Sequence, residues 1–263
     1  MLIRRDDDGT VATLTLDSPD TGNAISVAMA EELASRASEV AGDPAIRSVL
    51  LSANGRFFCV GGDVKAIGAA GDTVGALLDS ITAPLHAAIA TFLHMEKPLV
   101  VAVNGPVAGG GLGLALVGDI VLAATSAHFS MAYTGIGFSP DGASTWLLPR
   151  LIGLRRSQEL ALLNRRLSSD EAASIGLITR VVPDAELPSE SCSVAAALAN
   201  GPVGAHAAIR RLLLSSGDLS PEHQTEAEAH NVRSQAIGAE GQEGVAAFTQ
   251  KRKPDFLAAG RAG

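Results

Sequence analysis

The segment Lys97–Asp141 reads KPLVVAVNGPVAGGGLGLALVGDIVLAATSAHFSMAYTGIGFSPD. Its pattern of strand, glycine turn and helix is the strongest indication of the fold in this sequence. An apolar strand is predicted at Leu99–Val103, and three glycines, Gly109–Gly111, then open an apolar helical run at 112–117. Glycine at such a strand-to-helix turn allows the backbone to approach a ligand closely. Because the first N–H groups of a helix have no partner inside the helix and carry partial positive charge, this turn can bind a developing anion.

A second turn, Ser139-Pro140-Asp141-Gly142, ends the segment and carries an acidic side chain. We interpret the two turns as a catalytic arrangement in which the first polarises a carbonyl group. The second turn presents the carboxylate of Asp141 to the carbon beside that carbonyl. The structural alternative is that Asp141 only caps a helix predicted at 142–148, because aspartate is favoured at the N-cap position.

Another glycine turn, Val60-Gly61-Gly62-Asp63, follows a strand predicted at Ser48–Ser52. This turn and the turn at Gly109–Gly111 can each direct one backbone N–H group at a common point. Two such donors form an oxyanion hole, and loss of one donor typically slows a reaction by about 10²–10³. The alternative is that the glycines only form tight turns or allow close packing.

The composition is typical of a globular chain with a large apolar core. The chain has 263 residues, of which 47% are hydrophobic and 18% charged, so it fits one large domain or one domain with a modest appendage. A net charge of −8 argues against nucleic acid as a partner. Two cysteines are too few for a disulfide framework, and neither a signal peptide nor an uninterrupted apolar stretch of about 20 residues is evident. We therefore expect a cytoplasmic protein without membrane contact.

Strands and helices alternate along the first part of the chain. Apolar runs predict strands at 11–16, 48–52, 99–103, 119–125 and 177–182, with helical patterns between them. Residues 68–80 are small and polar, and we expect them to be mobile. Only helical patterns follow Pro188. The sequence thus predicts an α/β core at residues 1–187 and a helical region at 188–263.

Several other chemistries have no matching motif. The chain contains no G-x-x-x-x-G-K-[ST] phosphate loop, no G-x-G-x-x-G after a strand and no G-x-S-x-G nucleophile turn. Its six histidines show no H-E-x-x-H spacing, so we expect no metal site. His86 and His94 lie eight residues apart on one predicted helix, and we interpret them as partly exposed helix residues.

Several segments together carry a resemblance to a known family, namely Asn23-Ala24-Ile25, the loop Phe58–Val64, the run Lys97–Ala123, the turn Gly137–Gly142 and the ending KRKPDF. Over essentially its whole length the chain resembles the enoyl-CoA hydratase/isomerase family, the crotonase superfamily. The resemblance implies the crotonase (ClpP-like) fold, an α/β fold of repeated ββα units with a C-terminal helical trimerisation region. It also implies an acyl-CoA thioester substrate, whose coenzyme A is no separate cofactor, and a homotrimer or a dimer of trimers.

By this resemblance, the backbone N–H groups of Gly62 and Gly110 form the oxyanion hole for a thioester carbonyl. Lys65 matches a position where related proteins often carry a basic residue near the CoA phosphates, and a solvated surface lysine is the alternative. Tyr133 is either a polar wall of the acyl pocket or a packing residue. The expected substrate- and CoA-binding residues are Ala24, Val60, Gly61, Asp63, Lys65, Gly109 and Tyr133.

The chain departs from the hydratases of this family at both positions where they carry a catalytic glutamate. Gly113 and Tyr133 stand there, and neither can act as a carboxylate base. Asp141 instead matches an acidic position of the family's double-bond isomerases, including those of phenylacetate breakdown. One carboxylate is sufficient for isomerisation, because it can remove a proton from one carbon and return it two carbons away while the oxyanion hole stabilises the dienolate.

We therefore predict an enoyl-CoA isomerase with Asp141 as acid and base. The alternatives are enoyl-CoA hydration without the usual glutamates, an acyl-CoA dehalogenase or hydrolase, and a protein that binds acyl-CoA without turnover. The family's aromatic dehalogenases carry a nucleophilic aspartate at the position of Asp141 and use a histidine on an earlier helix. Ala90 holds that histidine position here, and His86 is one helical turn away.

Overall fold

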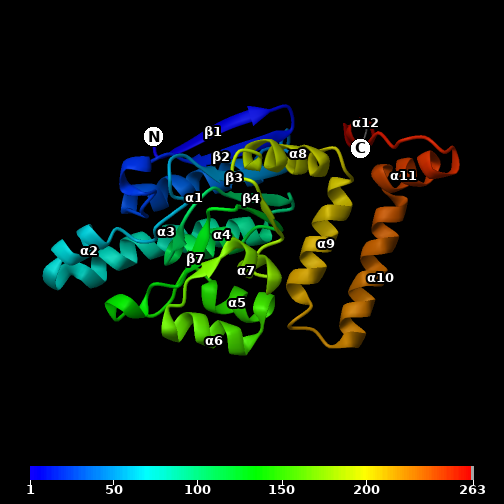
Figure 1. The fold of residues 1–263 in the computed structure, drawn as a ribbon. Coiled ribbons are helices and arrows are strands. Elements are labelled where there is room, and N and C mark those ends of the chain that lie inside the picture. The colour runs from blue at the N-terminus through cyan, green and yellow to red at the C-terminus, as the bar shows by residue number, and fades with distance from the viewer. Residues whose placement is uncertain (262–263) are drawn as a thin grey trace.

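A six-stranded sheet forms the centre of the molecule in the computed structural model, which describes residues 1–261 (Figure 1). The strand order is β1-β2-β3-β4-β6-β9; β1 runs antiparallel to β2, and all other neighbours are parallel. The predicted α/β class is confirmed. The strands are β1 (Ile3–Asp8), β2 (Val11–Leu16), β3 (Ser48–Ala53), β4 (Leu99–Val103), β6 (Ile120–Ala124) and β9 (Arg180–Val182).

Strand β1 has no apolar alternation in the sequence and was not among the predicted strands. Its residues after Ile3 are all charged, and only Ile3 is buried. The strand lies at the sheet edge, where charged side chains are common because one side of the strand faces solvent. It is held by its full register with β2 and by Arg5, whose guanidinium bonds both Asp7 and Asp43.

Two long helices pack against each other on the sheet: α1 (Val27–Gly42) and α3 (Val74–His94). Ser26 caps α1 by accepting a hydrogen bond from the Met29 N–H at 3.2 Å, which is worth about 1 kcal/mol. The stretch 68–80, which we expect to be mobile, is mostly helical: a short helix α2 (Val64–Ala69) is followed by a 3-10 turn at Gly71–Thr73 and then by α3.

Helix α3 is long and apolar, and one of its sides is buried in the fold. Among the described residues, the stretch Gly71–His94 passes a length-and-hydropathy test for a membrane span, with a mean hydropathy of 1.4, although only 28% of it is buried. Its side of Ile81, Leu85 and Phe92 is buried, and the helix packs along α1. This packing accounts for the apolar side of the helix.

A second, small sheet carries the turns that matter for the site. It consists of β5 (Val107–Ala108), β7 (His128–Ser130) and β8 (Leu167–Ser168). Each of the pairs β4–β5 and β6–β7 runs from the large sheet into the small one and then into a helix, as repeated ββα units require. The helices near this sheet are α4 (Gly110–Leu116), α5 (Ser144–Ile152), α6 (Leu154–Leu163) and α7 (Ser169–Ser174).

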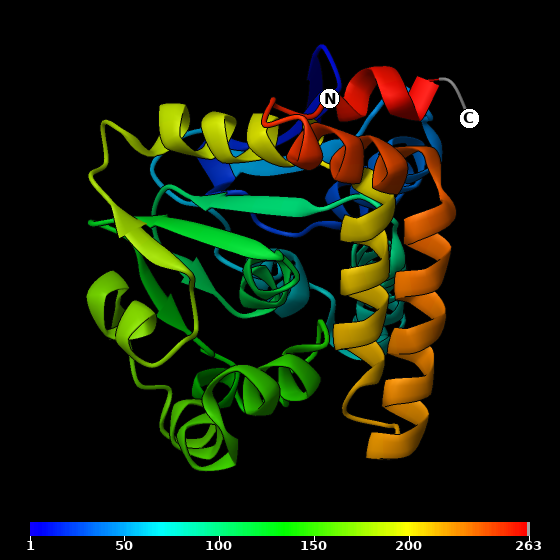
Figure 2. The ribbon, with the colours of Figure 1, turned by 90° about the vertical axis from the view of Figure 1, so that its right-hand side faces the viewer.

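The chain after residue 187 is helical, as the sequence predicts. Helix α8 (Leu187–Ala199) lies across the sheet and contacts β2, β3, β4 and β6 (Figure 2). The next two helices, α9 (Val203–Ser215) and α10 (Pro221–Ile237), stand side by side as an antiparallel pair in both views. The remaining helices are α11 (Ala239–Thr249) and α12 (Phe256–Arg261). The proposed division at residue 187 stays a prediction, and α8 itself is part of the layer on the sheet.

Candidate active site

The two glycine turns lie side by side because their flanking backbones pair. Isolated parallel bridges join Ile25 to Gly62 and Cys59 to Val107. The Ile25 N–H donates to the Gly61 carbonyl at 2.8 Å. A Cβ atom on Gly61 would lie 3.3 Å from the backbone nitrogen of Gly110, so the turns approach each other within van der Waals contact. Three segments far apart in the chain thus form one backbone cluster.

Asn23 stabilises the loops next to this cluster through hydrogen bonds of its side chain. Its side chain is fully buried and makes three hydrogen bonds: the Ser18 N–H donates to its Oδ1 at 2.8 Å, and its Nδ2 donates to the carbonyls of Asn54 at 3.0 Å and Phe57 at 2.8 Å. The Cys59 thiol donates to the Asn23 carbonyl at 3.1 Å. Since every polar atom of the amide group is used, Asn23 fixes the loop that precedes the first glycine turn.

Gly62 and Gly110 present free backbone donors to a cavity. Within residues 1–261, neither N–H group donates to a protein acceptor, and both residues line the same cavity. Gly109 precedes α4 with φ +54°, a conformation that glycine adopts without strain. The arrangement can offer two N–H groups to one oxygen atom of a ligand.

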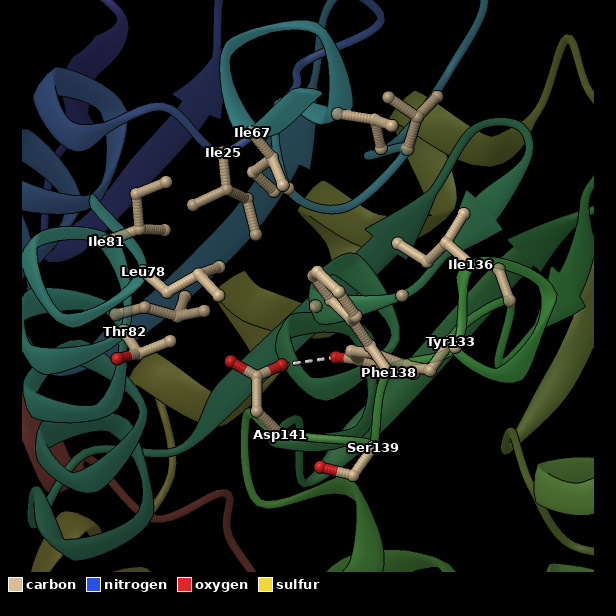
Figure 3. A pocket seen from close by; sticks show the side chains of 18 residues that line it. Ile25, Ile67, Leu78, Ile81, Thr82, Tyr133, Ile136, Phe138, Ser139 and Asp141 are labelled. Atoms are coloured by element: carbon tan, nitrogen blue, oxygen red, sulfur yellow. Dashed lines mark hydrogen bonds between the residues drawn. The ribbon is translucent and has the colours of Figure 1, made fainter. Parts of the chain in front are cut away.

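The cavity has a volume of about 600 Å³ and is lined mainly by apolar side chains (Figure 3). One wall comes from α2 and α3, and the opposite wall from the segment 132–139. This size is in the usual range for small-molecule sites. The lining residues are Ile25, Val60, Gly62, Val64, Ile67, Leu78, Ile81, Thr82, Leu85, Gly109, Gly110, Ala132, Tyr133, Ile136, Gly137, Phe138, Ser139 and Asp141.

Asp141 directs its carboxylate into this cavity and does not cap α5. The N-cap residue of α5 is Ala143, so the helix-cap interpretation of Asp141 is wrong. The Tyr133 hydroxyl donates to Asp141 Oδ1, as the dashed line in Figure 3 shows. The Asp141 carbonyl accepts from the Ser144 hydroxyl at 2.6 Å. A Cβ atom on Gly110 would lie 3.8 Å from Asp141 Oδ1, so the carboxylate lies beside the glycine turn.

Burial raises the pKa of Tyr133, and the nearby charge of Asp141 raises it further. The phenol therefore stays protonated at any physiological pH and acts only as a donor to Asp141. The Tyr133 side chain is also part of the cavity wall. Both expected roles, polar wall and packing, are compatible with this position, but the bond to Asp141 was not foreseen.

His86 lies closer to Asp141 than the sequence indicates. The side chain is about half exposed, at 49%, and its Nε2 is 3.4 Å from Asp141 Oδ2. The Gly142 N–H donates to the same Nε2 at 3.2 Å. His86 is not among the residues that line the cavity, although its Nε2 is close to the Asp141 carboxylate. The interpretation of His86 as a partly exposed helix residue is thus incomplete.

The position of Gly113 is closed to any side chain. A Cβ atom there would lie 2.2 Å from the Gly142 carbonyl oxygen and 3.2 Å from Gly142 Cα. Helix α4 and the turn that carries Asp141 are therefore in direct backbone contact. A carboxylate-bearing residue at position 113 does not fit this arrangement without movement of that turn.

The structure brings some of the expected binding residues to the cavity and leaves others outside it. Asp63 uses its carboxylate to cap α2, accepting from the Ala66 N–H at 3.0 Å. Lys65 is exposed on the same helix. Within the described residues, no group of three or more His, Cys, Asp or Glu side chains is arranged to hold a metal ion. Of the expected residues, those on the lining are Val60, Gly62, Gly109, Gly110, Tyr133 and Asp141, and those outside it are Ala24, Gly61, Asp63 and Lys65.

The chain is similar to proteins of known families over almost its full length. The family model described as Enoyl-CoA hydratase/isomerase matches residues 6–259. A protein named probable enoyl-CoA hydratase from Rhodobacter capsulatus is 38% identical over 248 residues, 94% of each chain. The 1,2-epoxyphenylacetyl-CoA isomerase of Escherichia coli is 38% identical over 251 residues, again 94% of each. The crystal structure of an enoyl-CoA hydratase from Polaromonas sp. JS666 superposes with a TM-score of 0.91 at 30% identity, covering 96% of this chain and 98% of that one.

Proposed function

The chain belongs to the enoyl-CoA hydratase/isomerase family and has its crotonase fold, and we propose that it moves a double bond within an unsaturated acyl-CoA, with Asp141 as acid and base. The observation that supports this most strongly is the position of the Asp141 carboxylate. It faces the cavity beside the free N–H group of Gly110. A carboxylate beside the N–H group that would bind the thioester oxygen is suited to removing a proton from the carbon next to that carbonyl.

In the proposed reaction, the thioester oxygen accepts hydrogen bonds from the Gly62 and Gly110 N–H groups. Asp141 takes a proton from C2, and the electron pair of that C–H bond moves into the dienolate. The two N–H donors stabilise the charge that develops on oxygen. Asp141 then returns a proton to C4, and the double bond ends in conjugation with the thioester. No atom is gained or lost, so the reaction needs no cofactor besides the CoA of the substrate.

Hydration by the usual glutamate pair is disfavoured by two positions. Position 113 has no room for a side chain, and position 133 holds a tyrosine whose hydroxyl is a donor to Asp141. A hydratase that acts without those glutamates remains the alternative, since Asp141 itself can act on water as a general base. The two reactions give different products from different substrates, which makes them separable by assay.

The cavity composition supports an apolar acyl group. Ten of its lining residues carry Ile, Leu, Val, Phe or Ala side chains, and Thr82, Tyr133, Ser139 and Asp141 are its polar side chains. We propose that the CoA part lies along the turns at Ala24 and Gly61, with Lys65 near its phosphates. An exposed lysine on α2 is free to reach a phosphate as a point charge.

We also propose a homotrimer or a dimer of trimers. Large apolar side chains are exposed on the C-terminal helices, including Leu213 at 71%, Ile237 at 73% and Phe248 at 85%. Exposed apolar groups of this kind mark association surfaces. Light scattering should then give a multiple of three chains of 26.7 kDa. The reducing cytoplasm remains the proposed compartment, since both cysteines are free.

The test supplies purified protein with a 3-enoyl-CoA and, separately, with a 2-enoyl-CoA. We expect a conjugated thioester from the first and no hydration of the second. Asp141→Asn should lose the isomerisation, by roughly 10³-fold, because it removes the base but keeps the shape of the side chain. Asp79→Asn, an exposed change on α3, is the matched control and should leave the rate unchanged. Fast hydration that survives in Asp141→Asn would refute the proposal.

A second reaction is favoured by one contact, the 3.4 Å approach of His86 to Asp141. In hydrolytic dehalogenation of an aromatic acyl-CoA, the Asp141 carboxylate would displace halide from the ring carbon and form an ester. His86 would then take a proton from the water that hydrolyses this ester, releasing the hydroxylated product and free Asp141. Halide release from a 4-halobenzoyl-CoA, measured with the same preparation, decides between this reaction and isomerisation.

A further inference from the structure

We propose that His86 connects Asp141 to solvent, so that the proton removed from the substrate exchanges with water before it is returned. This inference rests on the proposed isomerisation and concerns the fate of its proton. It assigns a role to a histidine that is not part of the cavity lining and that lies 3.4 Å from Asp141 Oδ2.

The two oxygens of the Asp141 carboxylate have different neighbours. Oδ1 accepts from the Tyr133 hydroxyl, which occupies that oxygen with a proton that is not given up. Oδ2 lies 3.4 Å from His86 Nε2. We therefore place a proton taken from the substrate on Oδ2. From Oδ2 the only titratable neighbour in the described contacts is His86.

The neutral form of His86 is fixed by the backbone. The Gly142 N–H can only donate, and it points at Nε2, so Nε2 is the acceptor and the ring proton is on Nδ1. In the resting site, Nε2 and Asp141 Oδ2 are thus two acceptors facing each other without a proton between them. When Asp141 has taken the substrate proton, an Oδ2–H group faces the Nε2 lone pair, and a hydrogen bond becomes possible at a slightly shorter distance.

The proton can then leave through the ring. Transfer from Oδ2 to Nε2 gives a carboxylate and an imidazolium, and no other bond changes. The imidazolium is half exposed, so its N–H protons exchange with water when the ring turns outward. A solvent proton returns by the same path to Oδ2 and then to C4 of the dienolate. Because the new N–H displaces the Gly142 bond, the imidazolium is a transient state and not the resting one.

Among the described residues, the cavity lining holds no titratable side chain besides Tyr133 and Asp141. The labelled side chains across the cavity from Asp141 include Ile25, Ile81 and Thr82, and of these only Thr82 is polar, with a hydroxyl that does not titrate (Figure 3). An apolar acyl group in this space excludes water from the substrate side of the carboxylate. Exchange with solvent therefore depends on His86, which is half exposed.

The experiment runs the isomerisation of a 3-enoyl-CoA in D₂O and measures deuterium at C4 of the product by mass spectrometry. His86→Gln is the informative variant, because the glutamine oxygen can still accept from the Gly142 N–H but cannot carry a proton. His94→Gln is the matched control, since His94 lies two turns further along α3 and bonds only the Ala90 carbonyl of its own helix. A saturated acyl-CoA, which has no double bond to move, reports exchange at C2 alone.

We expect wild type and His94→Gln to place deuterium in most of the product. His86→Gln should isomerise up to about threefold more slowly but lower the deuterium incorporated per turnover by tenfold or more. A merely structural role for His86 would reduce both quantities together.

Equal deuterium content in the products of wild type and His86→Gln overturns the relay, as does a wild type that isomerises with full retention of the substrate proton. If wild type exchanges C2 of the saturated thioester but does not isomerise, the proposed function fails. In that case the ratio of exchange rates between wild type and His86→Gln still decides the role of His86. Absence of both activities in wild type refutes both proposals.

Discussion

Replacing Gly113 with alanine should displace the turn that carries Asp141. The added Cβ would lie 2.2 Å from the Gly142 carbonyl oxygen, whereas carbon and oxygen normally keep more than 3 Å apart. Relief of the contact requires a backbone shift of about 1 Å, and Asp141 is the residue directly before the one that must move. If Asp141 is the base that we propose, its misplacement by that distance should lower the rate by roughly 10². Overpacking of the core should also lower the free energy of unfolding by about 1–3 kcal/mol, which lowers the melting temperature by roughly 3–9 °C.

The assay is the isomerisation rate of a 3-enoyl-CoA, measured beside the thermal unfolding of the same preparation. Gly75→Ala is the matched control, because its Cβ meets nothing within 4 Å and alanine favours the helix α3. The same reasoning predicts that Gly113→Glu will not restore hydration, since its carboxylate cannot enter without moving the turn. Gly113→Ala with wild-type rate and melting temperature would show that the contact is not rigid and would remove the steric argument.

Three further predictions concern the buried Asn23 and the two cysteines, Cys59 and Cys192. Asn23→Ala should destabilise the protein by about 2–4 kcal/mol in urea unfolding, because it removes three hydrogen bonds of a fully buried amide; an unchanged midpoint would contradict that role. Burial raises the pKa of the Cys59 thiol from 9.0 to about 12, so the folded state keeps this proton between those pH values while the unfolded state loses it. The free energy of unfolding should therefore fall by up to about 1.4 kcal/mol per pH unit between pH 9 and pH 12, and by less in Cys59→Ala. At pH 8, one thiol, that of exposed Cys192, should react quickly with a thiol reagent, and a second only on unfolding.

The parallel strands were predictable because their pattern is continuous. Strands β4 and β6 are apolar throughout, and β3 has the apolar centre Val49–Leu51 between two serines, as is typical of parallel strands that are buried on both faces. Strand β1 was missed because its stability comes from register with β2 and from Arg5 instead of apolar alternation. The first half of α3 was misjudged because glycine and polar residues interrupt its helical stripe, and the part facing the cavity is apolar only at Leu78 and Ile81.

The site was predictable as far as it depends on short motifs. The glycine turns and Asp141 were identified from the sequence, and the structure brings Gly62, Gly110 and Asp141 to one cavity. His86 was not, because its contact with Gly142 spans 56 residues of sequence and depends on where α3 passes the turn. The role of Asp141 as a helix cap was also left open by sequence, since an aspartate before a helix has the same local pattern in both cases.

The two departures from the hydratase pattern act on the same carboxylate. The absence of a side chain at Gly113 lets the backbone of Gly142 rest against α4, and this contact brings Asp141 to the glycine turn. The tyrosine at position 133 then donates to Asp141 Oδ1 and fixes the orientation of the group. A glutamate at either position would remove one of these supports, by steric exclusion at 113 and by repulsion between two carboxylates at 133. A two-glutamate site and the proposed single-acid site therefore exclude each other in this arrangement, so Gly113 and Tyr133 bear on the proposed reaction as much as Asp141 does.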